Sequence, residues 1–368
     1  MKVAYLMGSL NRGGAETLVL DICKNINEHN FEIILIHRKN GQLKEEFVQS
    51  GIELHQIHPK HIFDIAYFIK LRNIIIDNNI QIVHAHQVID AWLAYLATLF
   101  LSKKVLLSFH GHGINGNFTA NLLRKWVLTK TALNIFVSSS QKNYYEKKYK
   151  IIPKSIVLPN GIDLKKLHVQ HKQSIKAELG LSDTALLIGT VGNFTSGRDH
   201  FTLCKFLYLL KQTNIEFNFL FIGAESKTEP SIYNKCFAYC QENGLGNNVF
   251  FLGTRADVPD ILSQLDVFTY STEHDTFGIA VVEAMLMGIP VFVNDWEVML
   301  EITNEGKYAI IYKSKDEHDL LGKFNHFVDN IDTYRKVAKK NTLILKDKYS
   351  IGRHIFNLKN IYNSLLKD

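Results

Sequence analysis

The sequence has no long apolar runs and little proline. No stretch reaches the roughly 18 consecutive apolar residues that a helix needs to cross a bilayer, so we expect no membrane-spanning segment. The first residues, MKVAYLMGSLNRGGAE, lack the apolar region and cleavage site of a signal peptide. Six prolines and the absence of low-complexity tracts argue against long disordered linkers.

Cysteine is also scarce, and each of the four falls within a helical sequence pattern: Cys23, Cys204, Cys236 and Cys240. The last two are spaced as neighbours on a helix, but two thiols without a second ligand pair make a poor zinc site. We therefore expect reduced packing residues in a cytoplasmic protein.

No two aspartates are separated by a single residue, so the D-x-D device that holds a metal–nucleotide complex is absent. Four histidines, His84, His86, His110 and His112, follow two neighbouring strand-like segments. An H-x-H pair on a strand points both rings to one face without defining a third and fourth ligand. We predict a polar wall with His110 as a hydrogen-bond donor, and no metal or other cofactor.

The length of 368 residues predicts two domains, because single cores usually stop growing below that size. Charge is uneven: residues 1–170 hold 21 Lys and Arg against 12 Asp and Glu, and residues 171–368 hold 21 against 24. The basic first half indicates either a surface that faces an anionic membrane or phosphorylated substrate, or a solvated face. No nucleic-acid-binding module accompanies the charge, so nucleic acid is not expected as a partner.

Short β-branched runs alternate with amphipathic helical stretches, which predicts βαβ units and mainly parallel sheets. The pattern occurs twice, so we expect an α/β protein of two doubly wound domains, residues 1–168 and 169–349, with a terminal helix at 350–368. Seven strands are predicted in the first half, KVAYLM, FEIILIH, GIELHQI, IQIVHAH, KVLLSFH, LNIFVS and SIVLPN, and six in the second, ALLIGTVGN, EFNFLFIG, NVFFLG, DVFTYS, PVFVN and YAIIYK.

Ligands of such sheets bind in the loops that follow the strands. In GSLNRGGAET, Gly13 and Gly14 permit close approach of the backbone to a ligand, or form a plain turn; their spacing does not match a dinucleotide fingerprint. In TVGNFTSGRDHF, Arg198 beside a helix start suits a diphosphate, and a surface ion pair is the alternative.

The segment STEHDTFGIAVVEAM, residues 271–285, combines a strand end, an acidic loop and a short helix. Gly278 permits a tight turn and exposes N–H groups at the helix start. Glu283 lies among apolar neighbours and therefore needs a partner or a ligand. Asp275 either accepts a ligand hydroxyl or caps the helix.

With these loops the whole chain resembles the retaining GT-B glycosyltransferases of glycosyltransferase family 4. SLNRGGAE is similar to that family's glycine-rich loop, VLPNGID to its hinge-proximal strand, and FLGTRADVPDILSQLDVFTYSTEHDTFGIAVVEAMLMGIPVFVND to its signature block. The resemblance implies two facing Rossmann-like domains with a cleft between them and a C-terminal helix that crosses back to the N-terminal domain. It also implies a retaining, metal-independent hexosyl- or N-acetylhexosaminyl-type transferase that uses a UDP- or GDP-sugar, with a saccharide or lipid-linked saccharide acceptor.

The resemblance assigns roles to individual residues. His110, Arg198 and Asp275 are expected to be catalytic, with Asp275 contacting the donor sugar and Glu283 binding the ribose. The other expected donor-binding positions are Gly13, Gly14, Asn193, Gly223, Thr254, Arg255, Phe277, Gly278 and Ile279.

The chain departs from the family pattern at two positions. Asp275 replaces a glutamate, and Asn193 replaces an arginine of the pair that grips the diphosphate. The alternatives left open are a GT-B-type sugar-nucleotide epimerase and a non-catalytic nucleotide-sugar-binding subunit. The basic, aromatic segment from residue 118 to 154 is either a contact with the inner face of an anionic membrane or a solvated helix surface.

Overall fold

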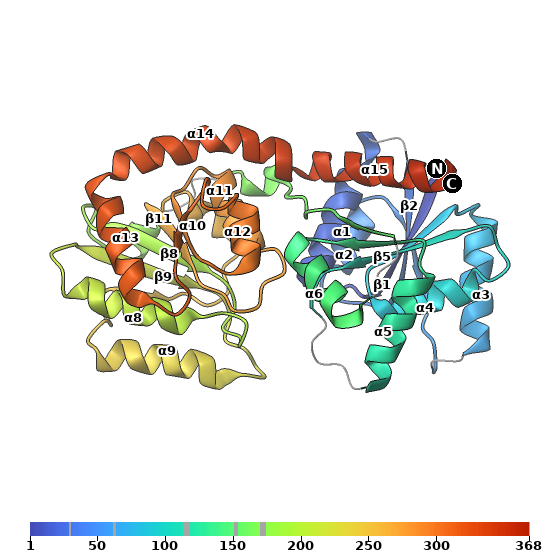
Figure 1. Ribbon diagram of the computed structural model, residues 1–368, viewed down its shortest axis with the longest axis horizontal. Coiled ribbons are helices and arrows are strands. Elements are labelled where there is room, and N and C mark those ends of the chain that lie inside the picture. Colours follow the sequence, from blue (N-terminus) through green and yellow to red (C-terminus); the bar gives the residue numbers. More distant parts are fainter. Residues whose placement is uncertain (29–30, 62–63, 113–117, 151–153, 170–173, 368) are drawn as a thin grey trace. The chain divides into compact units, whose positions relative to one another are not determined.

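The computed structural model describes residues 1–28, 31–61, 64–112, 118–150, 154–169 and 174–367. It divides the chain into two compact units (Figure 1). The N-terminal unit comprises Met1–Asp163 and Tyr349–Asp368, and the C-terminal unit comprises Leu164–Lys348.

A seven-stranded parallel sheet forms the centre of the N-terminal unit, in the order β3–β2–β1–β4–β5–β6–β7. All seven strands predicted for this half are present: β1 (Lys2–Ser9), β2 (Glu32–Lys39), β3 (Glu53–Gln56), β4 (Ile82–Ala85), β5 (Lys104–Phe109), β6 (Leu133–Phe136) and β7 (Ser155–Val157). The continuous apolar runs arise because both faces of the sheet are covered by helices.

Each face of this sheet packs against its own set of helices. Val3, Tyr5 and Met7 of β1 point to one core, while Ala4 and Leu6 point to the other, as the alternation of side chains along a strand requires. The first core includes α1 (Gly14–Lys24), α2 (Lys44–Gln49) and α15 (Ile351–Lys367), and the second includes α3 (Ile65–Asp77), α4 (Val88–Ala97), α5 (Phe118–Lys130) and α6 (Ser139–Tyr149).

The C-terminal unit repeats this plan with six parallel strands in the order β10–β9–β8–β11–β12–β13. The strands again match the predicted segments: β8 (Leu186–Val191), β9 (Phe217–Ile222), β10 (Val249–Phe251), β11 (Val267–Tyr270), β12 (Val291–Asn294) and β13 (Ile310–Tyr312). The prediction of two doubly wound parallel sheets is confirmed.

Helices cover both faces of the second sheet (Figure 1). On one face α8 (His200–Lys211), α9 (Pro230–Glu242) and α13 (Glu317–Asp329) bury a core rich in phenylalanine. The other elements of this unit are η2 (Leu164–Leu167), α7 (Ile175–Leu179), α10 (Val258–Leu262), α11 (Ile279–Leu286), α12 (Glu297–Thr303) and α14 (Ile331–Tyr349).

The four cysteines lie in α1, α8 and α9, and all are buried and free. Burial raises the pKa of the Cys23 thiol, which keeps it protonated as a packing residue. Among the helices described, none combines the length and apolarity needed to span a membrane.

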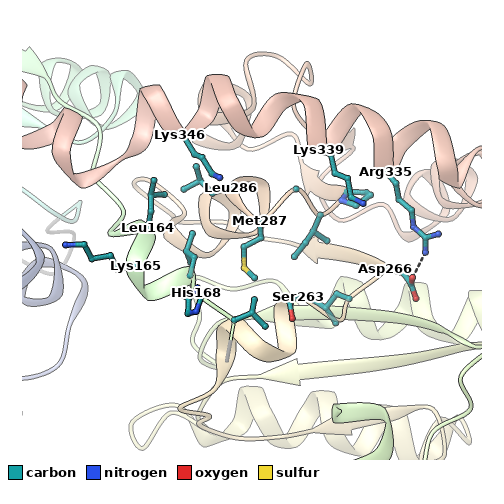
Figure 2. Close-up of a pocket in the computed structure, with 16 residues that line it drawn as sticks. Leu164, Lys165, His168, Ser263, Asp266, Leu286, Met287, Arg335, Lys339 and Lys346 are labelled. Carbon is teal, nitrogen blue, oxygen red and sulfur yellow. Dashed lines mark hydrogen bonds and ion pairs between the residues drawn. The ribbon is translucent and has the colours of Figure 1, made fainter. Parts of the chain in front are cut away.

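A cavity of about 910 Å³ lies in the C-terminal unit (Figure 2). Its walls include Leu265 and Asp266, which lead into β11, and Pro290, which leads into β12. The cavity therefore lies at the amino ends of these strands, away from the loops that follow their carboxyl ends.

Candidate functional site

The strand order of the C-terminal sheet reverses between β8 and β11. In open α/β sheets the loops at such a reversal diverge, and ligands bind at the carboxyl ends of the strands there. The loop after β8 carries Arg198, and the loop after β11 carries Asp275. Two residues that are 77 positions apart are thus brought to one edge.

These two loops are bonded to each other along their backbones. The Asp199 N–H donates to the Ser271 carbonyl at 3.1 Å. The Thr272 hydroxyl donates to the Gly197 carbonyl at 2.9 Å, and Arg198 forms an antiparallel bridge with Thr272. Several hydrogen bonds between the two loops therefore fix their relative position, and no single side-chain contact does so alone.

Asp275 is the centre of a small polar cluster. Its carboxylate oxygen Oδ2 accepts hydrogen bonds from Nη1 of Arg198 and from the hydroxyl of Tyr270. The Arg198 guanidinium also lies over the Tyr270 ring, with Cζ 4.8 Å from its centroid. The side chains of Arg198 and Asp275 remain 24% and 17% exposed, so the pair is accessible to a ligand. Two simpler alternatives, a surface ion pair for Arg198 and helix capping by Asp275, do not account for this arrangement.

Glycine is required at the start of α11. Gly278 has φ of +82°, and a Cβ there would lie 2.7 Å from Cε of Met299 and 3.3 Å from Cδ1 of Ile302. Phe277, just before it, is buried, and Ile279 begins the helix. The first N–H groups of α11 therefore begin directly after the Asp275 loop, at an edge suited to anions.

Glu283 lies in the second turn of α11. Its neighbours Val281, Val282, Ala284 and Met285 are buried, while Glu283 itself is half-buried. A carboxylate among such neighbours is positioned to accept hydrogen bonds. By contrast, Glu273 forms an exposed ion pair with Lys315 at 3.0 Å.

Asn193 and Gly223 follow β8 and β9, and they are in contact. The Asn193 Oδ1 accepts a hydrogen bond from the Ala224 N–H at 2.9 Å. A Cβ at Gly223 would lie 2.1 Å from the Gly192 carbonyl oxygen, so only glycine fits between these loops.

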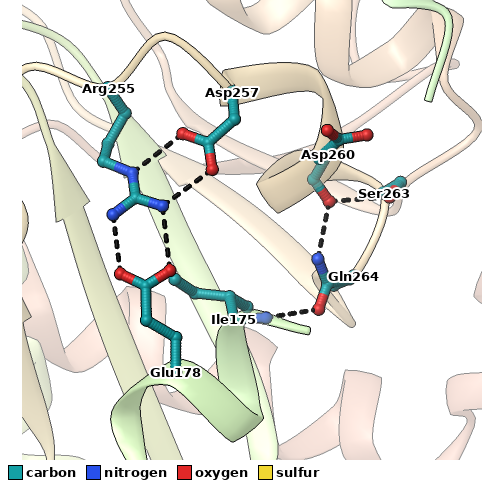
Figure 3. A network of polar contacts seen from close by, with 7 residues as sticks. All are labelled: Ile175, Glu178, Arg255, Asp257, Asp260, Ser263 and Gln264. Carbon is teal, nitrogen blue, oxygen red and sulfur yellow. Dashed lines mark hydrogen bonds and ion pairs between the residues drawn. The ribbon is translucent and has the colours of Figure 1, made fainter. Parts of the chain in front are cut away.

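Arg255, which follows Thr254 in the loop after β10, is held by two carboxylates (Figure 3). It donates to Glu178 at 2.7 and 3.0 Å and to Asp257 at 2.8 and 2.7 Å. The Arg255 guanidinium lowers the pKa of the Glu178 carboxyl. In the structure Arg255 therefore ties α7 to the start of α10.

His200 was not singled out from the sequence, yet it lies directly beneath the Arg198 loop. It is 1% exposed, and its Nε2–H donates to the Gly192 carbonyl at 3.2 Å. Burial, and then the charge of Arg198, lower its pKa to about 4, so His200 is neutral at physiological pH. A histidine at the start of an apolar helix carries no distinguishing sequence signal. The same holds for Tyr270 at the end of an apolar strand.

In the N-terminal unit the predicted strand-end histidines form a stacked row. The His84 and His86 ring centroids are 4.6 Å apart, those of His86 and His110 are 5.3 Å apart, and His86 Nδ1 lies 3.0 Å from His110 Nε2. Burial lowers the pKa of His110 to about 4 and that of His84 to about 3. All three rings are thus neutral, and each of them carries a single N–H donor.

The expectation of a polar wall is wrong for His84, because this residue is a core residue. It is 1% exposed, with Nδ1 2.6 Å from the Tyr362 hydroxyl and Nε2 2.7 Å from the Ser108 hydroxyl. The sequence could not indicate this, because Tyr362 comes from the terminal helix α15. Within the part of the chain that is described, no group of three or more His, Cys, Asp or Glu side chains is arranged to hold a metal ion.

Gly13 and Gly14 follow β1 at the start of α1. Gly13 is the N-cap residue and has an extended backbone, with φ of −145°, which any residue can adopt. Gly14 is exposed and begins the helix. The backbone conformation here therefore does not require glycine, and a Cβ at Gly13 would meet the Glu16 side chain, with Oε2 at 2.5 Å.

Two family models match the chain. Residues 12–166 match Glycosyltransferase Family 4, and residues 171–343 match Glycosyl transferases group 1. Among curated proteins, the chain is similar to the O-antigen biosynthesis glycosyltransferase WclY of Escherichia coli, with 23% identity over 100% of this chain and 99% of the relative. It is also similar to the capsular polysaccharide biosynthesis glycosyltransferase CapH of Staphylococcus aureus, with 24% identity over 77% and 78%.

Solved structures share the fold. A glycosyltransferase from Rickettsia africae has a TM-score of 0.88 and 21% identity, covering 100% of this chain and 99% of that one. Anabaena HepE in complex with UDP has a TM-score of 0.87 and 17% identity, covering 99% and 100%.

Proposed function

The chain belongs to the GT-B glycosyltransferases of the family 4 type, and from that premise we propose that it moves a sugar from a nucleotide-diphosphate sugar to a saccharide or lipid-linked saccharide in polysaccharide biosynthesis. The observation that carries this proposal is the cluster of Arg198, Tyr270 and Asp275 beside the start of α11. It combines an anion-binding group with a hydroxyl-accepting group at the reversal point of a parallel sheet.

We assign the roles as follows. Asp275 accepts a hydrogen bond from a hydroxyl of the donor sugar, and Glu283 accepts from the ribose. Arg198 and the first N–H groups of α11 bind the diphosphate. Asn193 and Gly223 line the loops near the nucleotide. His110 in the N-terminal unit donates its one N–H to the sugar, and this unit binds the acceptor.

Arg198 has a further role in rate acceleration. Cleavage of the bond between sugar and phosphate develops negative charge on the diphosphate, and donors fixed in advance stabilise that charge. Loss of one such donor typically costs ~10²–10³ in rate. Because Asp275 already holds the guanidinium in place, Arg198 needs little reorganisation when the diphosphate binds.

We propose that transfer retains the anomeric configuration by same-face attack of the acceptor hydroxyl, assisted by the leaving phosphate oxygen. Asp275 is the carboxylate of the cluster, and its oxygen Oδ2 already accepts hydrogen bonds from Arg198 and Tyr270. We therefore assign it a positioning role and not that of a covalent nucleophile. Trapping a glycosyl adduct on Asp275 or another carboxylate with a slow fluorosugar donor would refute this mechanism.

The donor is proposed to be a UDP-sugar, with a GDP-sugar as the alternative. Support comes from the relatives, since one of them is named a UDP-Gal:alpha-D-GlcNAc-diphosphoundecaprenol alpha-1,3-galactosyltransferase. Thermal shift with UDP-, GDP- and ADP-sugars tests the choice, because a ligand at 100 times its Kd adds ~2.7 kcal/mol of stability. A shift with UDP-sugars that disappears in Glu283→Ala is expected, and a shift unchanged in that variant would contradict the assignment.

Activity is tested by incubating the enzyme with the stabilising donor and candidate acceptors, in EDTA, because no metal is proposed. Transfer in EDTA is the expected result. Formation of an epimerised sugar nucleotide without acceptor would instead identify an epimerase. Tight donor binding with neither transfer nor hydrolysis would identify a non-catalytic subunit, the alternative that the departures at Asp275 and Asn193 favour.

We also propose that the protein is cytoplasmic and that α5 contacts the inner face of the membrane. Phe118 and Leu122 on this helix are 81% and 59% exposed, and the exposed Lys125 and Lys130 follow them on the same helix. Apolar side chains next to basic ones are the pattern of interfacial helices. Co-sedimentation with anionic vesicles at low salt, reduced in the double variant Phe118→Ser and Leu122→Ser, is expected; no co-sedimentation would dismiss the contact.

A further inference from the structure

The lining of the cavity of about 910 Å³, drawn in Figure 2, includes no residue of the cluster around Asp275. The cavity opens at the amino ends of β11 and β12, whereas Arg198 and Asp275 lie at the carboxyl ends. A strand of four residues separates the two edges by about 13 Å. The cavity has the size of typical small-molecule pockets and no role in the proposed transfer.

The walls combine an apolar floor with a basic rim. Three segments of the C-terminal unit supply the floor: the 164–169 segment, the residues before β11, and the residues between α11 and β12. The apolar side chains are Leu164, Leu167, Val169, Leu265, Leu286, Met287, Ile289 and Pro290. The basic side chains are Lys165, Arg335, Lys339 and Lys346, and Asp266 is the single acid among the described lining residues.

The one acid does not neutralise the lysines. Asp266 accepts hydrogen bonds from Arg335 and, at 2.8 Å, from the N–H of Leu187. Lys339 and Lys346 form no ion pair within the described part of the chain. Their charge is therefore available to an anion in the cavity.

The two lysines are held on one side of α14. They are seven residues apart, which is about 10 Å along the helix and close to two turns. A Cβ at Gly288 would lie 3.4 Å from Cα and Cγ of Lys339 and 3.1 Å from Cγ2 of Thr342, so α14 packs directly on this glycine. In Figure 2 the Lys346 side chain extends from α14 toward Leu286, and Met287 lies between the two lysines.

We propose that this cavity is a binding site for an amphiphilic phosphate, with the phosphate at Lys339 and Lys346 and the hydrocarbon chain along the apolar floor. The charge complementarity requires an anion, and the eight apolar side chains of the lining disfavour a fully hydrated one. The site is independent of the nucleotide-sugar cluster. The ligand is either a free amphiphile or a lipid within a bilayer, and both present the same phosphate and chain.

The test measures binding of decyl phosphate, below its micellar concentration, to the full chain by isothermal titration calorimetry. Inorganic phosphate supplies the charge alone, and decyl glucoside supplies the chain alone. We expect decyl phosphate to bind at least about tenfold more tightly than either, since each part adds its own interaction. Equal binding of inorganic phosphate or of decyl glucoside would overturn the proposal.

Variants on one helix separate the site from general surface charge. Lys339→Ala and Lys346→Ala should each weaken decyl phosphate binding about tenfold, because a hydrogen bond to a charged group is lost. Lys336→Ala and Lys340→Ala, which change exposed residues of α14 outside the cavity lining, should have no effect. Equal losses in both pairs would overturn the proposal, and all four substituted lysines are exposed, so folding should be preserved.

Met287→Gln tests the floor. It should weaken decyl phosphate while leaving the weak binding of inorganic phosphate unchanged, and an unchanged affinity for decyl phosphate would count against the site. Vesicles that contain phosphatidic acid then identify the source. Lys339-dependent binding to vesicles supports a membrane lipid in the site, and Lys339-dependent binding of the monomer alone supports a free amphiphile. In every variant, UDP-sugar binding should remain at the wild-type level.

Discussion

The Asp275 carboxylate accepts hydrogen bonds from Arg198 and Tyr270, whereas Glu273, two positions earlier, forms an exposed pair with Lys315. Exposed pairs of this kind contribute little to stability, because water and salt screen them. At the scale of single residues, two acids in one loop therefore have different environments. Only Asp275 faces the Arg198 guanidinium at the sheet reversal.

Asp275→Asn should lower the transfer rate by ~10² or more, because the amide loses the negative charge that orients Arg198 and accepts the sugar hydroxyl. Glu273→Gln is the matched control and should retain most activity. Initial rates with a saturating donor check both variants. A larger loss of activity in the Glu273 variant would show that Glu273, and not Asp275, is the acid that contacts the donor sugar.

Buried histidines give the N-terminal unit a pH dependence. Burial lowers the pKa of His84 to about 3, and those of His110 and His354 to about 4, from an ordinary 6.5. In the unfolded chain these rings take up protons below about pH 6.5, while in the folded chain they stay neutral down to about pH 4. The unfolded state therefore binds more protons in this window, and stability falls as the pH decreases through it.

His354→Asn should make this loss of stability shallower by up to about 1.4 kcal/mol per pH unit between pH 6.5 and 4. His354 Nδ1–H donates to the Pro159 carbonyl at 2.8 Å, and an asparagine amide can replace that bond without titrating. Denaturant unfolding across the pH range measures the slope. An unchanged slope in His354→Asn would contradict the prediction.

At the scale of elements, α11 depends on the glycine that precedes it. Gly278 has a positive φ and is packed against Met299 and Ile302 of α12. A side chain there has to move α11 away from α12 or distort the loop that carries Asp275. The geometry of the start of α11 and the position of Asp275 are therefore coupled.

Gly278→Ala should destabilise the protein by about 1–3 kcal/mol and weaken donor binding, because it combines backbone strain with a steric clash. Gly322→Ala, in the exposed interior of α13 with nothing near its Cβ, should be stabilising by about 0.5–1 kcal/mol. Chemical denaturation and UDP-sugar titration measure both quantities. If Gly278→Ala binds the donor with wild-type affinity, the start of α11 is not part of the donor site.

At the scale of the whole molecule, the last helix completes the first unit. Ile355, Leu358 and Tyr362 of α15 lie in the same buried core as β1 and α1, and the Tyr362 hydroxyl lies 2.8 Å from that of Tyr5. The core of the N-terminal unit is thus completed by α15, which is distant in sequence from β1 and α1.

Leu358→Ala should destabilise the N-terminal unit by about 2–5 kcal/mol, because a fully buried leucine leaves a cavity. The C-terminal unit should be unaffected, since the core that contains Leu358 belongs to the other unit. Leu366→Ala on the same helix, at a side chain 39% exposed, is the control. Calorimetry, with proteolysis to identify which unit unfolds, measures the difference; equal effects of the two variants would contradict the prediction.

The strands of both sheets were predictable because parallel strands covered on both faces are continuous apolar runs bounded by turns. The loops that carry Arg198 and Asp275 followed from the same pattern, since chemistry collects at the carboxyl ends of such strands. Their roles, and those of Glu283 and His110, stay predictions. The environments of Arg255 and His84 did not follow, since their partners are Glu178 and Tyr362, far away in the sequence.

The sequence by itself determined the two parallel sheets, the loops that bear polar groups and the glycine at position 278, because periodicity and turn chemistry are local properties. Only the tertiary structure decided that Tyr270 and Arg198 share one oxygen of Asp275, that His84 is a core residue, and that Lys339 and Lys346 line a cavity with an apolar floor. Those facts depend on distances between segments that the packing of separate elements brings together, and no local pattern records such distances.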